Sequence, residues 1–254
     1  MSLSSNTIIH FTNTKSNLIG ILKDNFKLKY CRETIETKKK KADLLIPMVS
    51  FCDIPFSQIL KHIDNYGSYG IGLKKEWAER NGLNPVLYVD KNSSLSDNFF
   101  EHIYKLNSTG DKNINELEIE EKYIYDIFRY LKNYEGDLKR FQKKPIKDYR
   151  FSDEREWRFV LNIESKALML GAIPTTHSKN DNTIKEIKNV LNEEIENEKL
   201  SFDPDDINYI IVKNESERDS IIKALESVKG KFPLDQVKRL TSRILSVEQI
   251  RNDF

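Results

Sequence analysis

Two acidic residues separated by a single position form the strongest chemical pattern in the sequence. The stretch from Arg150 to Leu161 alternates charged and large apolar residues, and this alternation predicts a strand. Side chains two positions apart lie on the same face of a strand, so Glu154, Glu156 and Arg158 share one face. Adjacent carboxylates repel each other, so their proximity needs an explanation.

Two explanations are open from these residues alone. In the first, the acids form salt bridges with Arg158 and lysines at the surface, an arrangement that adds little to stability. In the second, the pair belongs to a catalytic site in which one carboxylate stabilises positive charge that develops on a substrate, and the other orients a nucleophile.

A histidine near the end of the first predicted strand is another candidate. The β-rich run Ile8–Thr12 contains His10, and binding sites tend to open at strand ends, where side chains and loops converge. A lone histidine is also common as a structural residue, so both roles stay open. The four histidines lie far apart and neither cysteine has a partner at ligand spacing, so we expect no metal site.

Composition limits the classes of function. The 254 residues include 41 Lys and Arg against 40 Asp and Glu, a net charge of +1, so no global field attracts nucleic acid or membrane. The run Lys38–Lys41 is typical of a solvated loop, with contact to substrate phosphates as the alternative. Two cysteines are too few for a disulfide framework, and neither a signal sequence nor a long apolar run occurs. We therefore expect a soluble, cytoplasmic protein with no membrane segment.

The stretch Pro47–Trp77 predicts the centre of the fold, in the order of a strand at Met48–Cys52, a helix at about Phe56–Asn65 and a strand at Tyr69–Leu73. Glycines at positions 67, 70 and 72 indicate a wall where the backbone approaches either a neighbouring strand or a ligand.

Four short strands in the first ninety residues, separated by helices or loops, predict an α+β fold rather than a regular parallel βαβ series. Further along, Ile207–Val212 is nearly all apolar, as expected for an interior strand. We expect one domain, 1–254, with an inserted helical segment at about 91–148.

Within that insertion the pattern predicts helices at Asn98–Leu106 and Asn115–Leu138. Five apolar residues recur at helical spacing in the second helix and are predicted to face the core: Ile119, Tyr123, Ile127, Tyr130 and Leu131. The opposite face could hold a partner or a target.

Several stretches together carry a family resemblance: His10–Thr12, Asn17–Ile19, Pro47–Leu73, Asn84–Tyr88, Asp153–Phe159, Ser242–Leu245 and Gln249–Phe254. They resemble the abortive-infection AbiGi family of bacterial phage-defence proteins over most of the chain outside the insertion. That family carries an antitoxin label.

The layout also resembles, more distantly, the ADP-ribosyltransferase superfamily, whose split mixed or antiparallel sheet is surrounded by helices. His10 and Thr12, followed by Asn17, are similar to the opening of DarT-type enzymes that modify nucleic-acid bases. Ser50 matches the start of the second motif, where many relatives have tyrosine. Glu156 matches the late glutamate.

This resemblance implies roles for the matching residues toward NAD. His10 and Thr12 would hydrogen-bond ribose hydroxyls, and Tyr66 or Tyr69 would stack on nicotinamide. Glu156 would stabilise the oxocarbenium-like ribose that forms when nicotinamide leaves.

The second acid and the arginine have implied roles as well. Glu154 would orient or deprotonate the acceptor, and Arg158 would pair with the acids or contact a phosphate.

Two functions from different classes follow. The first is an NAD-dependent ADP-ribosyltransferase toxin or effector of an anti-phage system that modifies a macromolecule, with nucleic acid (DNA or RNA) favoured over protein. The second is a non-catalytic antitoxin or regulatory partner on the same scaffold, which would bind a cognate toxin. The position of His10 relative to Glu156 discriminates between them, because an enzyme needs both at one NAD molecule.

Overall fold

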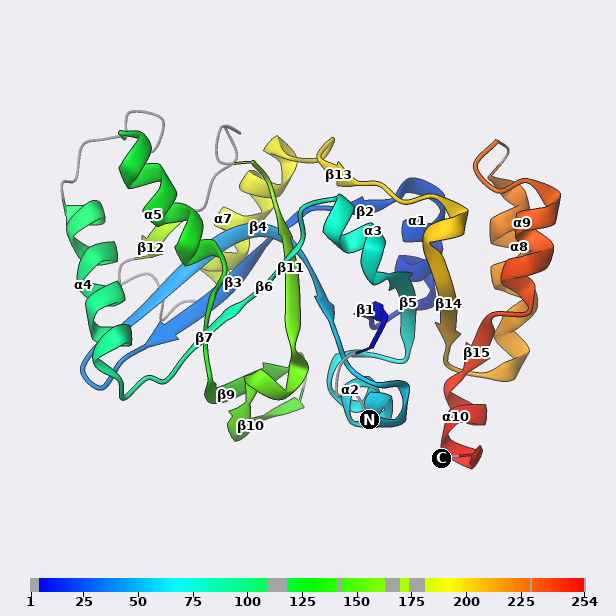
Figure 1. Ribbon diagram of the computed structural model, residues 1–254, viewed down its shortest axis with the longest axis horizontal. Coiled ribbons are helices and arrows are strands. Elements are labelled where there is room, and N and C mark those ends of the chain that lie inside the picture. The colour runs from blue at the N-terminus through cyan, green and yellow to red at the C-terminus, as the bar shows by residue number, and fades with distance from the viewer. Residues whose placement is uncertain are drawn as a thin grey trace.

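The computed structural model describes residues 5–108, 118–140, 143–162, 170–173, 181–228 and 230–253. Within these residues the chain is an α+β protein built on a mixed, largely antiparallel sheet (Figure 1). The nine strands of this sheet are β1 (Thr7–Thr12), β3 (Lys29–Glu36), β4 (Lys41–Cys52), β5 (Tyr69–Lys74), β6 (Asn84–Pro85), β11 (Glu156–Val160), β12 (Leu170–Ile173), β14 (Ile207–Val212) and β15 (Ile244–Ser246).

Strand β4 organises the sheet because it is long enough to pair with four neighbours. Met48 lies opposite both Lys29 of β3 and Val160 of β11, so these two strands flank β4 on opposite sides. Farther along, Cys52 lies between Ile9 of β1 and Glu156 of β11. The sheet therefore divides along β4 into one half with β3 and β12 and another with β1, β5, β14 and β15.

Three short pairs complete the strands. Strand β2 (Phe26–Lys27) pairs with β13 (Lys199–Leu200), and β9 (Glu135–Arg140) forms a hairpin with β10 (Lys143–Arg150). Strands β7 (Leu87–Val89) and β8 (Leu131–Asn133) are parallel.

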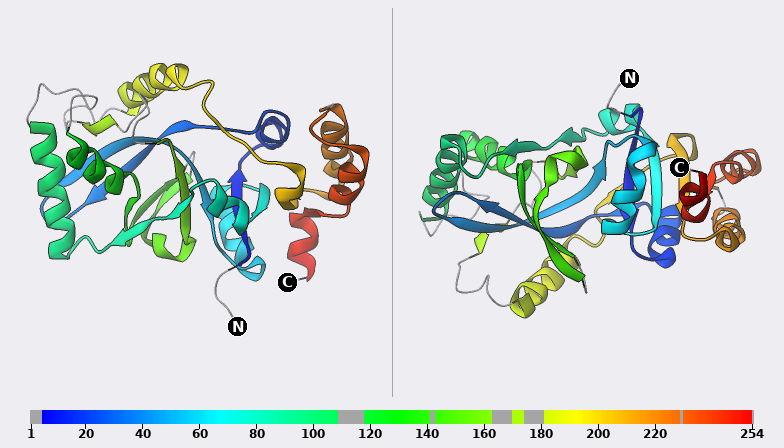
Figure 2. Two further views of the ribbon diagram at one scale, coloured as in Figure 1. Left: turned by 45° about the horizontal axis from the view of Figure 1, so that its top comes forward. Right: turned by 90° about the horizontal axis from the view of Figure 1, so that it is seen from below.

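Helices cover both halves of the sheet. They are α1 (Lys15–Asp24), α2 (Ile59–Tyr66), α3 (Lys75–Arg80), α4 (Ser94–Ser108), α5 (Ile119–Arg129), α7 (Asp181–Glu194), α8 (Arg218–Ser227), α9 (Leu234–Thr241) and α10 (Val247–Asp253), with 3-10 turns η1 (Phe56–Gln58), η3 (Phe151–Glu154), η4 (Pro204–Asp206) and η5 (Glu215–Glu217). Helices α8 and α9 lie at one end of the elongated molecule, and α4 and α5 at the other (Figures 1 and 2). In the described part of the chain, no helix combines the length and apolarity needed to cross a bilayer.

The core follows the alternation of side chains along the strands. Leu44 and Ile46 of β4 pack with Phe128 of α5, whereas Leu45 between them belongs to the cluster that includes Ile184 of α7. Since successive strand residues face opposite sides, α5 and α7 cover opposite faces of this half of the sheet, as Figure 2 shows.

The second helix of the predicted insertion is shorter than expected. Helix α5 ends at Arg129, and the chain continues into β8, β9 and β10, so the predicted helix at Asn115–Leu138 is wrong beyond this residue. The described part of the 91–148 segment thus contains strands as well as helices. The parallel pairing of β7 with β8 imposes this change, because it draws the chain from Leu131 onward into extended backbone.

Helix α5 also buries a different face from the predicted one. Tyr125 and Phe128 are buried, whereas Ile119, Tyr123 and Ile127 are 44–56% exposed. The helix carries two apolar rows, and spacing alone does not tell which row meets the sheet. The prediction of a core stripe through the three exposed residues is therefore wrong.

The four-lysine run forms the turn between β3 and β4. The Thr37 amide donates to the Lys40 carbonyl at 2.8 Å, and Lys38, Lys39 and Lys40 are exposed. This confirms the solvated loop.

The glycines near β5 make room for neighbouring protein. Gly67 has φ 124°, and a Cβ there would lie 2.3 Å from the Thr12 carbonyl oxygen. A Cβ at Gly72 would lie 2.5 Å from the ring of Tyr209. Of the two explanations for the glycine wall, close packing of backbone against β1 and β14 accounts for both positions.

We predict that Gly67→Ala lowers the free energy of unfolding by about 2 kcal/mol or more, because both the positive φ and the contact with Thr12 oppose a side chain. Urea denaturation followed by circular dichroism measures the change. Gly20→Ala is the matched control: nothing lies within 4 Å of a Cβ at this position of α1, so we expect a gain of up to about 1 kcal/mol. Equal effects of the two substitutions would contradict this account.

Candidate functional site

A cavity of about 270 Å³ opens where β1, β4 and β11 meet. Five of the eight predicted site residues line it: His10, Ser50, Tyr66, Glu154 and Glu156. The early histidine and the late acidic pair, 144 or more positions apart in the sequence, thus face a common space.

The charged face of β11 points inward. Glu156 and Arg158 are 5% and 0% exposed, whereas Trp157 and Phe159 on the other face are only half-buried. The predicted alternation is confirmed. The predicted salt bridges with Arg158 and a lysine are present, but their location at the surface is wrong, because the acids and Arg158 are buried. Glu154 lies in turn η3 rather than on the strand, and it is also buried.

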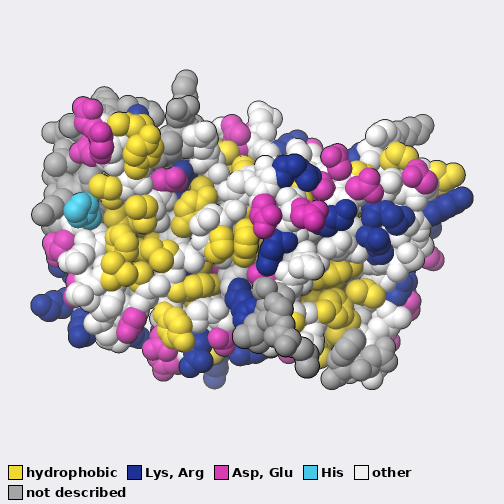
Figure 3. All heavy atoms as spheres, in the orientation of Figure 1, with side chains coloured by type: hydrophobic (Ala, Val, Ile, Leu, Met, Phe, Trp, Pro, Cys, Tyr) yellow, Lys and Arg dark blue, Asp and Glu magenta, His cyan; other side chains and the backbone are white. Residues whose placement is uncertain are grey.

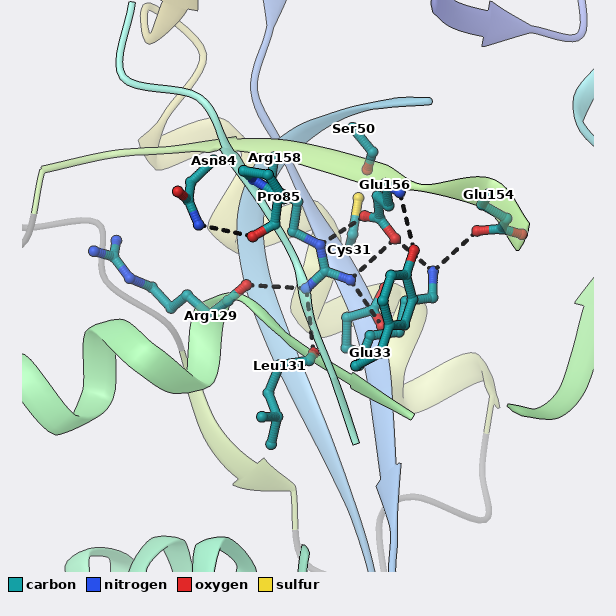
Figure 4. Close-up of polar contacts among 12 residues, drawn as sticks. Cys31, Glu33, Ser50, Asn84, Pro85, Arg129, Leu131, Glu154, Glu156 and Arg158 are labelled. Atoms are coloured by element: carbon teal, nitrogen blue, oxygen red, sulfur yellow. Dashed lines mark hydrogen bonds and ion pairs between the residues drawn. The ribbon is translucent and has the colours of Figure 1, made fainter. Parts of the chain in front are cut away.

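Arg158 holds the inner end of the cluster (Figure 4). Its Nε donates to Glu156 Oε1 at 2.6 Å, and a terminal nitrogen lies 3.2 Å from Glu33 Oε2. The other terminal nitrogen donates to the carbonyl oxygens of Arg129 at 2.9 Å and Leu131 at 3.5 Å. Each part of the buried guanidinium therefore has an acceptor, as a buried charge requires.

Lys132 of β8 bridges the two acids from the other side. Its Nζ lies 2.6 Å from Glu156 Oε2 and 3.4 Å from Glu154 Oε2, and 4.9 Å from the centre of the Phe151 ring. The hydroxyl of Tyr66 donates to Glu154 Oε1. Neither carboxylate is left without a positively charged or hydrogen-bonding neighbour.

The two acids differ in proton affinity. Burial raises the pKa of Glu154, although Lys132 and the Tyr66 hydroxyl oppose this effect. Burial alone would also raise the pKa of Glu156, but Arg158 and Lys132 together outweigh it and lower this pKa to about 2. Three carboxylates, those of Glu33, Glu154 and Glu156, thus share two cations. Both cations, Arg158 and Lys132, lie against Glu156.

His10 lines the cavity, and its imidazole ring is neutral. Its Nδ1 lies 2.9 Å from the carbonyl oxygen of Ser50, which only accepts, so Nδ1 carries the proton. Burial lowers the pKa of His10. Its ring packs edge-on against Phe26 and Phe51 at 5.2 and 5.7 Å. Ser50 contributes this carbonyl to the histidine.

Three predicted site residues do not line the cavity. Thr12 accepts a hydrogen bond from Asn17 at 3.1 Å, and the hydroxyl of Tyr69 donates to Glu217 at 3.0 Å. Arg158 lies behind Glu156 with no exposure, where it pairs with the acids and presents no surface to the cavity.

Sequence reasoning missed Lys132 and Glu33. Lys132 falls inside a predicted helix, and Glu33 lies on β3, a strand that we did not predict. His62 of α2 also lines the cavity, where burial, with help from Lys132, lowers its pKa to about 4. No local sequence pattern marks any of the three, because each joins the site only through contacts between segments that are far apart in the sequence.

Thiol chemistry finds no support at this site. Cys31 and Cys52 line the cavity, but burial raises the pKa of Cys31 to about 11 and that of Cys52 well above its ordinary value. Both thiols are therefore protonated and weakly nucleophilic at neutral pH. Among the described residues, no group of three metal-ligating side chains gathers.

The fold and site define an α+β protein with a divided mixed sheet and a small cavity closed on one side by buried ion pairs. A family model described as "Putative abortive phage resistance protein AbiGi, antitoxin" matches residues 24–213. An abortive phage resistance protein AbiGi from Lactococcus lactis subsp. cremoris is 30% identical over 228 residues, which cover 82% of this chain and 89% of that protein. The chain therefore belongs to the AbiGi family of abortive phage resistance proteins. No solved structure matches it significantly.

We predict that Lys132→Met lowers the free energy of unfolding by about 3 kcal/mol at pH 7, because it leaves buried carboxylates short of a counter-charge. In the wild type, the low pKa of Glu156 stabilises the fold above the ordinary carboxyl pKa of 4.5, and this stability is lost as pH falls toward 2. The variant's carboxylates take up protons at higher pH, so its deficit relative to wild type shrinks between pH 7 and pH 5.

Urea denaturation at both pH values measures this difference. Lys61→Met is the matched control, since that side chain is 72% exposed and 4.0 Å from Asp153. A Lys132→Met deficit that is as small as the control's, or that does not depend on pH, would show that the cluster does not stabilise the fold.

Proposed function

We propose that this chain is the antitoxin of an abortive-infection system: a non-catalytic protein that binds a cognate toxin and restrains it until phage infection. Membership of the AbiGi family supports a role in phage defence, and the family description names an antitoxin. The observation that carries the non-catalytic part is the neutralisation of Glu156 by the protein's own cations.

A carboxylate that assists cleavage of the nicotinamide bond must direct its charge at the ribose. Here Glu156 Oε1 accepts from Arg158 Nε at 2.6 Å and Oε2 from Lys132 Nζ at 2.6 Å, so both oxygens are engaged. The cavity of about 270 Å³ is also slightly smaller than ordinary ligand pockets, which span roughly 300–1,000 Å³. Both observations favour a structural role for the acidic pair.

A second candidate, an NAD-dependent ADP-ribosyltransferase, is favoured by one observation. His10, Tyr66 and Glu156 line a single cavity, as the residues implied by the resemblance would in an enzyme. An adjoining cavity of about 410 Å³ shares Glu33, Tyr66 and Lys132 with the first and also includes Lys139. Joined, the two would offer room for more of a dinucleotide, with lysines near its phosphates.

Co-expression tests the antitoxin proposal. We expect that a protein encoded beside this chain in its genome arrests bacterial growth when expressed alone, and that co-expression of this chain restores growth. The physical reason is mass action: a tight complex leaves little free toxin. Flanking products that are harmless alone, or a toxic one that this chain does not neutralise, would contradict the antitoxin function.

Expression of the chain alone separates the two candidates. We expect wild type and Glu156→Gln to be equally harmless, and purified wild type incubated with labelled NAD and cell lysate to transfer no label to nucleic acid or protein. Growth arrest by wild type that disappears in Glu156→Gln, together with label transfer by wild type alone, would establish the enzyme instead. Digestion of the labelled product with nuclease or protease would then identify the acceptor.

A further inference from the structure

Exposed hydrophobic residues are concentrated at one end of the molecule. Of the eight large hydrophobic side chains that are exposed in the described part of the chain, six lie between positions 87 and 134: Leu87, Leu95, Ile119, Tyr123, Ile127 and Tyr134. Figure 3 shows hydrophobic side chains gathered on this face over α4 and α5. Single exposed apolar residues are ordinary, but a gathered set marks a surface for contact.

Three of the six form a row along α5. Ile119, Tyr123 and Ile127 follow one another at four-residue spacing, which places them on one side of a helix. Each residue turns the helix by about 100°, so this row lies opposite the side formed by Tyr125 and Phe128, which meets the sheet. A solvent-facing side normally carries charged residues, so this row has no explanation in the folding of the chain itself.

Charge around the row is asymmetric. From its cap at Glu118 to its end at Arg129, α5 carries four carboxylates and two cations, and the arginine is buried and bonded to Asp126. Glu118 and Glu121 also cap the helix, whereas exposed Glu120 makes no such bond. A net negative helix on a chain of net charge +1 is complementary to a basic partner.

We propose that the α5 face, defined by Ile119, Tyr123, Ile127 and Glu120, is the docking surface for the cognate toxin, and that the toxin presents an apolar ridge flanked by lysine or arginine. The inference rests on the proposed antitoxin function and names the surface that would perform it. Tyrosine at the centre of the row suits this role, because aromatic residues dominate the energetics of interfaces.

Binding of the toxic flanking product tests the inference, measured by isothermal titration calorimetry with this chain intact. We expect the double variant Tyr123→Ala/Ile127→Ala to raise the Kd at least tenfold, the scale of an interface hot spot. Glu120→Lys should also weaken binding, and by a larger factor at low salt than at high salt. The reason is that salt screens the interaction between residue 120 and the basic groups of the toxin. The thermal midpoint of unfolding should not change, since these side chains are exposed.

Val190→Ala is the matched control, because Val190 of α7 is 60% exposed and lies outside the α5 face. Wild-type affinity of the α5 variants would overturn this inference and leave the antitoxin function standing, whereas a wild-type chain that neutralises no flanking product removes the proposed function itself. A wild-type dimer in light scattering that dissociates in the Tyr123→Ala/Ile127→Ala variant would assign the face to a second copy of this chain and also overturn the proposal.

Discussion

The buried guanidinium of Arg158 is the constraint on which the arrangement of this protein depends. A charge with no exposure must be paired, and its partners come from three separate places: Glu156 on its own strand, Glu33 on β3, and the carbonyls that join α5 to β8. These segments must converge for the charge to be buried at all. The ion cluster therefore specifies how the half of the sheet that carries α5 is assembled.

The ion cluster around Arg158 also determines which side of α5 faces solvent. The carbonyl oxygen of Arg129, the last residue of α5, accepts a hydrogen bond from Arg158. The guanidinium of Arg129 donates in turn to the Leu161 carbonyl at 2.7 Å. These bonds lock the rotation of the helix about its axis, with Phe128 against β4. The row containing Tyr123 then faces solvent, so the buried ion pairs account for which side of α5 is exposed, but not for its apolar side chains.

Local patterns in the sequence predicted what local physics decides. The apolar strand β14 and the alternation along β11 follow from neighbours within a few positions. The prediction that failed was which face of a strand or helix points into the protein and which points to solvent. Glu156 and Arg158 turn inward only because Lys132 and Glu33 arrive from other strands to balance them, and no stretch of sequence around β11 contains that information. The two rows of α5 are indistinguishable for the same reason.

The balance of charges bears on where recognition takes place. With 41 basic and 40 acidic residues, the protein has no long-range field to attract a partner, and surface charges are screened beyond about 10 Å at 0.1 M salt. Inside, Arg158 and Lys132 neutralise Glu156, so this carboxylate presents little charge to a ligand. Binding of the proposed toxin must then come from short-range contact, where apolar area supplies the affinity and a few local charges select the partner. A surface such as that of α5, apolar at its centre and acidic beside it, satisfies both conditions.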